Sequence, residues 1–208
     1  MKRLYVISSL HLSDDPIENS QFRLEEILEV RLRLIEALIL KLGKGSYFSD
    51  GMYEFVARSL NNGLTRRTLR EIREANKRSY ELGGDGFRMY DIGRVAESFK
   101  HLEGRGVKFR FRTTEDENGL RRPLEERDAE IVASILRYGS RENILFAGIA
   151  HRLEPLYGSG LAWHHTSIVT SGDTILVGGD FPKELGPLKP LPKKTKSGMS
   201  IEYILEYV

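Results

Sequence analysis

The sequence predicts an α/β fold with a mostly parallel central sheet flanked by helices and a β-hairpin near the C-terminal end. Two segments, 4–11 and 144–151, share one design, in which a strand-like apolar run leads through a small residue to a histidine. A strand that is apolar on both faces belongs inside a parallel sheet. Between the two segments, apolar residues recur at helical spacing, which indicates the helices that flank such a sheet.

The elements of the first half follow from local patterns. The first strand ends at about His11, and from about Asn19 to Leu42 the apolar positions predict one long, largely buried helix that Gly43 stops. The section 46–62 indicates a shorter helix after a Ser-Asp-Gly turn. A strongly charged helix is expected over 66–82, where a solvated face with paired charges is the favoured interpretation.

The second half alternates between helix and strand patterns. We expect a helix over 92–102 and a half-exposed strand over 107–111. Pro123 then opens a helix that runs to about Tyr138, with acidic residues in its first turns, where the helix dipole favours negative charge. This helix leads directly into the second histidine strand.

The C-terminal part predicts a hairpin and a terminal strand-like element. Segments 167–170 and 174–177 are separated by Ser-Gly-Asp, which is typical of a hairpin, and we expect this hairpin at the sheet edge. Residues 1–180 are expected to form a single α/β domain. Residues 181–208, an irregular segment rich in Pro and Lys followed by a short terminal element, are expected to pack on the same domain.

Composition narrows the class of protein. The 208 residues carry 32 Lys and Arg against 30 Asp and Glu, a net charge of +2, which is too balanced to predict nucleic-acid or membrane binding. Cysteine is absent, so His and carboxylates are the strong metal ligands that remain. The most apolar window, 32–42, is interrupted by charges and is too short for a membrane span. We expect a cytoplasmic protein with no membrane partner and a thermophile-like composition.

The two strand-terminal histidines are the main candidates for a functional site. Ligands of open α/β sheets bind at the carboxyl ends of the strands, so His11 and His151 can meet there if their strands are neighbours. Imidazole is a good ligand for first-row metals, and two histidines with one or two carboxylates would leave a coordination position for water. Gly148 permits a close backbone approach beside the second histidine.

A dense charged cluster at 121–128 offers further candidates. In the functional interpretation, Arg127 holds a substrate carboxylate or stabilises an oxyanion, while Glu126 or Asp128 orients a water or joins the metal. On spacing alone, a charged and well-capped helix start explains the cluster without any function. The pair His164 and His165 can add at most one ligand, because neighbouring residues on a strand point to opposite faces.

The order of these motifs resembles the TraB/TIKI superfamily, whose wider relatives include the erythromycin esterases and the ChaN-like proteins. Members carry two GxxH motifs, and in the TraB and TIKI branches a short Glu/Asp-Arg-Asn/Asp helix motif precedes the second one. Segments 8–11 and 148–151 match the GxxH motifs, and 126–128 matches the helix motif. The resemblance implies an α/β fold and, in the TIKI branch, metal-dependent peptidase activity with His11 and His151 as the motif histidines.

Two features depart from that family pattern. The first motif begins with Ser8 in place of glycine. The acidic residue that the family carries after a second strand has no counterpart that we identify in the sequence between Ala37 and Phe55. Loss of activity or a changed substrate would be consistent with both departures.

Two rival functions start from the same sequence. The segment 7–12 also resembles the opening of calcineurin-like metallophosphoesterases, but Ser9 stands where those enzymes need an aspartate and their later motifs are absent. A non-catalytic domain would instead use the 66–78 helix and the lysines of 189–196 to bind nucleic acid or an acidic partner.

The hypothesis we favour from sequence is a divalent-metal hydrolase, peptidase- or esterase-like, acting on a small-molecule or peptide substrate. In it His11 and His151 hold the metal, and the catalytic residues come from the helix motif. Glu126 is a ligand or base, Arg127 steadies the developing negative charge, and Asp128 is the third member of that motif.

Overall fold

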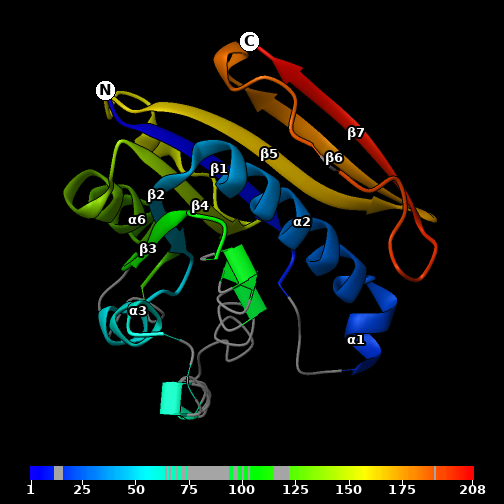
Figure 1. Ribbon diagram of the computed structural model, residues 1–208, viewed down its shortest axis with the longest axis horizontal. Coiled ribbons are helices and arrows are strands. Elements are labelled where there is room, and N and C mark those ends of the chain that lie inside the picture. Colours follow the sequence, from blue (N-terminus) through cyan, green and yellow to red (C-terminus); the bar gives the residue numbers. More distant parts are fainter. Residues whose placement is uncertain are drawn as a thin grey trace.

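The computed structural model contains a seven-stranded sheet with the strand order β3-β2-β4-β1-β5-β6-β7 (Figure 1). It describes residues 1–11, 16–63, 104–114, 122–189 and 191–208, together with positions 65, 67, 68, 70, 71, 74, 94, 95, 98, 99, 101 and 102. The strands are β1 (Arg3–Ser9), β2 (Lys44–Ser49), β3 (Lys108–Arg112), β4 (Glu142–Gly148), β5 (Ala162–Ser171), β6 (Thr174–Phe181) and β7 (Ser200–Tyr207). The helices described include α1 (Pro16–Gln21), α2 (Leu24–Leu42), α3 (Glu54–Asn61) and α6 (Leu124–Tyr138).

The sheet is parallel except at the hairpin. Strand β1 pairs in parallel with β4 on one side and β5 on the other, β2 pairs in parallel with β3 and β4, and β7 is parallel to β6. Only β5 and β6 run antiparallel among the described strands. The predicted α/β class with a mostly parallel sheet and a C-terminal hairpin is therefore confirmed. The hairpin does not lie at the sheet edge, because β7 pairs beyond β6.

The central strands are apolar on both faces because each face packs against a helix. Tyr5 and Ile7 of β1 belong to the cluster that includes the apolar side of α2, whereas Leu4 and Val6 belong to the cluster that includes α6. Figure 1 shows α2 crossing in front of β1 and β5. Burial on both faces explains the continuous apolar runs that predicted these strands.

The predicted single helix over 19–42 is wrong, because the structure has two helices there. Helix α1 ends at Gln21 and α2 begins at Leu24, and between them Arg23 has a left-handed backbone with φ 54°. Apolar residues continue through this turn, from Phe22 and Leu24 to Ile27 and Leu28. Periodicity alone therefore cannot detect the change of direction.

The predicted helix over 46–62 is right only in its second part. Its beginning is strand β2, and helix α3 follows a turn. Strand β2 is buried between β3 and β4, and a Cβ on Gly45 would lie 2.6 Å from the carbonyl oxygen of Glu142, so only glycine fits the close backbone approach there.

Other expected elements agree with the structure or fall outside it. The strand over 107–111 and the helix opened by Pro123 are present as β3 and α6. Most of the charged helix expected over 66–82 lies outside the described residues, and of 92–102 the described positions are helical. None of the helices in the described part of the chain is long and apolar enough to cross a membrane.

Candidate functional site

Three parallel strands end at one rim of the sheet, and each is followed by a titratable side chain. Asp50 comes directly after β2, His11 follows β1, and His151 follows β4. These strands are neighbours in the order β2-β4-β1, so their carboxyl ends bring the three side chains together. Both histidines contact the carboxylate of Asp50, as expected if their strands were adjacent.

Asp50 is the centre of this arrangement. Its Oδ2 lies 2.8 Å from Nε2 of His151 and 3.5 Å from Nε2 of His11, and its Oδ1 accepts a 2.5 Å hydrogen bond from the Arg127 guanidinium. The Asp50 side chain is only 1% exposed. A carboxylate so buried needs charged partners, and Arg127 supplies one. We call His11, Asp50, Arg127, Asp128 and His151 the site cluster.

Asp128 holds the second histidine from the other side. Its Oδ1 pairs with Nδ1 of His151, and its Oδ2 accepts hydrogen bonds from the backbone N–H groups of Arg152, at 3.1 Å, and Leu153, at 3.0 Å. Leu153 is in the left-handed region with φ 53°, a conformation that costs about 1–2 kcal/mol for a residue with a side chain. Asp128 thus fixes both the imidazole ring and the strained chain that follows it.

The two carboxylates determine the charge of His151. Burial lowers the pKa of His151, but the hydrogen bonds and charges of Asp50 and Asp128 act in the opposite direction and together prevail. The pKa of His151 therefore lies above its ordinary value of 6.5. The two carboxylates on either side of the ring, Asp50 at Nε2 and Asp128 at Nδ1, therefore favour its protonated form.

This raised pKa predicts a loss of stability in alkaline solution. A histidine whose folded pKa exceeds its unfolded value contributes stability that is fully present below the unfolded pKa of about 6.5 and is lost as the pH rises through the folded value. We expect the urea midpoint to fall between about pH 6 and about pH 9 by more in the natural protein than in His151→Gln. His101→Gln, which changes an exposed histidine, is the control and should keep the natural pH dependence. An equal slope in all three proteins would contradict the prediction.

His11 is held against the strand that carries Gly148. Its ring contacts Phe146 edge to face at 5.0 Å between centroids, and its side chain is 10% exposed. The fully buried Arg31 also contacts Phe146, with its guanidinium carbon 4.0 Å from the ring centroid, and donates to Oγ of Ser9 at 3.4 Å. The aromatic ring therefore links a buried cation to the histidine.

Gly148 lies so close to His11 that a side chain there would displace the ring. A Cβ would lie 3.0 Å from Nε2 and 3.3 Å from Cδ2 of His11. We expect Gly148→Ala to reduce by about tenfold or more the activity that we propose for this site, since misplacing a reactive group by a fraction of an ångström weakens its alignment. Gly178→Ala, in strand β6 with nothing within 4 Å of the new Cβ, is the matched control and should be near neutral. Equal steady-state rates for the two variants would contradict this role of Gly148.

The structure gathers some of the predicted residues and separates others. Arg127 and Asp128 are buried in the site cluster, whereas Glu126 is exposed in the first turn of α6. His164 pairs with Asp180 at 2.6 Å, and His165 contacts Oγ of Ser8 at 2.9 Å. Neither of these two histidines lines the cavity at the cluster.

Sequence reasoning missed Asp50, and the expectation of no acidic residue after a second strand is wrong. Asp50 is missed because the pattern of residues 46–62 favours a helix where the structure has strand β2. The sequence signal for this strand is the run Tyr47-Phe48-Ser49 followed by an Asp-Gly turn. A short apolar run that ends at such a turn is typical of a strand.

The site cluster opens into a cavity of about 340 Å³, which we call the site cavity. Its lining includes three members of the cluster, His11, Asp50 and His151. Arg127 and Asp128 are not part of the lining, so they act on the residues that are. A ligand in the site cavity would therefore meet two imidazoles and the carboxylates of Asp50 and Glu18.

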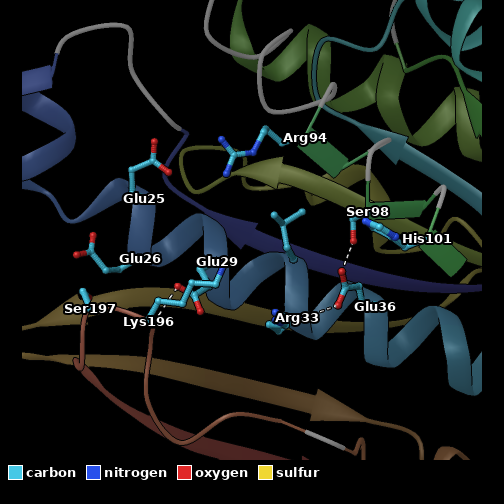
Figure 2. A pocket seen from close by; sticks show the side chains of 11 residues that line it. Glu25, Glu26, Glu29, Arg33, Glu36, Arg94, Ser98, His101, Lys196 and Ser197 are labelled. Atoms are coloured by element: carbon cyan, nitrogen blue, oxygen red, sulfur yellow. Dashed lines mark hydrogen bonds and ion pairs between the residues drawn. The ribbon is translucent and has the colours of Figure 1, made fainter. Parts of the chain in front are cut away.

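A second cavity, of about 570 Å³, lies along α2 and has a charged lining (Figure 2). Glu36 pairs with Arg33 at 3.1 Å and accepts a hydrogen bond from Ser98, and Glu29 accepts one from the backbone of Lys196 at 3.2 Å. These contacts describe a hydrogen-bonded surface groove. The site cavity, in contrast, combines buried histidines with a buried carboxylate.

Comparison with known proteins gives no match from which a function could be inferred. No protein-family model matches the chain, and no curated protein or solved structure matches it. Within the described residues, no set of three or more His, Asp and Glu side chains has the arrangement of a metal-binding group. The cluster in this structure is instead joined by hydrogen bonds and ion pairs.

Proposed function

We propose that the site cavity is the active site of a hydrolase that cleaves an acyl bond of the ester or amide type. The observation that supports this most directly is the Asp50 carboxylate, which is held by Arg127 and contacted by both strand-terminal histidines at the base of a cavity. Groups that accept a proton, donate one and stabilise negative charge thus lie within reach of one bound substrate.

The residues of the cavity can divide the chemistry between them. His11 takes a proton from water as the water oxygen attacks the acyl carbon, with Asp50 stabilising the resulting imidazolium. The positive charge of His151 stabilises the oxyanion that forms on the former carbonyl oxygen. When the oxyanion collapses, the bond to the alcohol or amine breaks, and His11 returns its proton to that leaving group.

Arg127 and Asp128 have supporting roles in this proposal. Arg127 donates to Asp50 and pairs with its carboxylate, and Asp128 orients His151 through its Nδ1. The role of Arg127 on the substrate, which the sequence predicted, passes to His151, because His151 lines the cavity and Arg127 does not.

A divalent metal ion is the cofactor that the sequence predicts, and it stays part of the proposal. Two imidazoles and one carboxylate are the right types of donor for a first-row ion, which His11, Asp50 and His151 would hold. Such an ion would supply a bound water of lowered pKa. The arrangement described here differs from a ligand set, since His151 Nε2 and Asp50 Oδ2 are at hydrogen-bond distance.

Hydrolysis of chromogenic esters, peptide amides and phosphate esters by the purified protein tests the proposal. We expect ester or amide cleavage that is lost in His11→Ala and kept in His164→Ala, a histidine outside the cavity. Full activity in both His11→Ala and His151→Ala would overturn the assignment, and cleavage of phosphate esters alone would favour a phosphoesterase.

Elemental analysis separates the two forms of the proposal. About one divalent ion per chain that is lost in both histidine variants, together with inhibition by a chelator, would establish the metal-dependent form. Activity that survives the chelator in metal-free protein would establish the form in which the chain's own side chains activate the water.

A further inference from the structure

Exposed apolar side chains form part of the lining of the site cavity. Among the described residues, Leu10, Phe22 and Ile149 are large apolar residues that remain 37%, 43% and 45% exposed, and all three line this cavity. The rest of the apolar lining is Leu24, Leu124 and Ala150. Single exposed apolar residues are ordinary, but a group of them at one cavity marks a binding surface.

These side chains come from separate elements that the fold brings to the same rim. Leu10 follows β1, Ile149 follows β4, and Phe22 lies in the turn between α1 and α2. In that turn Arg23 adopts its left-handed backbone, a conformation that residues with side chains avoid. The exposed ring of Phe22 is thus held at the cavity by a turn whose backbone conformation at Arg23 is energetically unfavourable.

The charges of the described lining residues disfavour a negatively charged substrate. Besides the two histidines, the charged residues that line the site cavity are Glu18 and Asp50, and no Lys or Arg belongs to the lining within the described residues. Arg127, the nearest guanidinium of the site cluster, is engaged by Asp50 at 2.5 Å. Within the described lining, a substrate carboxylate or phosphate would meet Glu18 and Asp50 and no Lys or Arg, whereas a neutral apolar group would lose little hydration and gain apolar contacts.

We infer that the site cavity recognises an uncharged substrate through an apolar acyl chain or side chain next to the bond that is cleaved. This inference rests on the proposed hydrolase function and adds the substrate class to it. The apolar group contacts Phe22, Ile149 and Leu10 at the rim, and the acyl carbon reaches His11 and His151 at the base. The cavity volume of about 340 Å³ lies within the range of small-ligand pockets.

A series of p-nitrophenyl esters from acetate through butyrate to hexanoate measures this recognition. We expect kcat/KM to rise by about fourfold for each methylene that becomes buried. Phe22→Ala and Ile149→Ser should flatten that rise, while a hemisuccinate ester with a free carboxylate should be a poor substrate. Phe55→Ala is the matched control, because Phe55 is 41% exposed on α3 and lies outside the cavity lining.

Binding of hexanamide, measured by calorimetry or NMR titration, separates this inference from the hydrolase proposal. Ester hydrolysis without dependence on chain length, or unchanged by Phe22→Ala and Ile149→Ser, would overturn the apolar site and leave the hydrolase. Hexanamide binding that both variants weaken by about tenfold or more, in a protein that hydrolyses nothing, would support the apolar site and refute the hydrolase. No binding and no chain-length effect would overturn the inference in either case.

Discussion

Asp50→Asn is expected to lower kcat/KM by at least about a hundredfold, the scale of a lost acid–base group. The amide keeps the size of the side chain but removes the charge that pairs with Arg127 and with both histidines. The pKa of His151 should fall at the same time, because one of the two carboxylates that raise it is gone. Steady-state kinetics and an NMR titration of the ring measure the two effects.

Glu126→Gln is the control for this prediction. It removes the same charge one residue from Arg127, but on an exposed position of α6, so activity and the pKa of His151 should stay close to natural. Asp50→Asn also leaves a buried guanidinium without its carboxylate, which costs about 3–5 kcal/mol in buried pairs. Activity is therefore compared at a temperature where circular dichroism shows both variants folded. An active Asp50→Asn would refute the central role of this residue.

Asp128→Ala is expected to lower the free energy of unfolding by about 3 kcal/mol or more, since hydrogen bonds to a charged group contribute about 1.5–3 kcal/mol each. Three donors lose their acceptor: the ring of His151 and the backbone N–H groups of Arg152 and Leu153. The left-handed conformation of Leu153 loses its support as well. Urea unfolding at about neutral pH measures the change.

Two other variants are the controls for this loss of stability. Asp180→Ala removes a carboxylate that also contacts a histidine and a backbone N–H, but its side chain is 36% exposed, so the loss should be about 1 kcal/mol or less. Asp128→Asn keeps an oxygen that can accept from the backbone and should restore part of the stability. If Asp128→Ala were no less stable than Asp180→Ala, the described hydrogen bonds would not carry the stability assigned to them.

The central strands could be predicted from sequence because their signal is local. Strands β1 and β4 are continuous apolar runs, and a histidine follows each at the rim where ligands bind. Strand β2 has only Tyr47 and Phe48 as large apolar residues, and its identity depends on pairing with β3 and β4, which are distant in the chain. The propensities of single residues carry no information about such neighbours. Without strand β2, the sequence gives no reason to place Asp50 at the rim of the sheet.

The helix motif shows a second limit of sequence reasoning. The sequence presented Glu126, Arg127 and Asp128 as one functional group, but successive residues of a helix point in different directions. Arg127 and Asp128 face the core of the site, and Glu126 faces solvent. Which of the three adjacent charged residues faces the protein interior depends on the rotation of α6 about its axis. The spacing of apolar residues determines this rotation only to within about one residue.

The strand order determines when in folding the site cluster is assembled. The site cluster is contributed by positions 11, 50, 127, 128 and 151, and these residues meet only when β1 has been joined by β4, a partner from much later in the chain. Parallel pairings over such separations form late in folding. A nascent or half-folded chain therefore lacks the assembled site cluster, which forms only when the native sheet is complete.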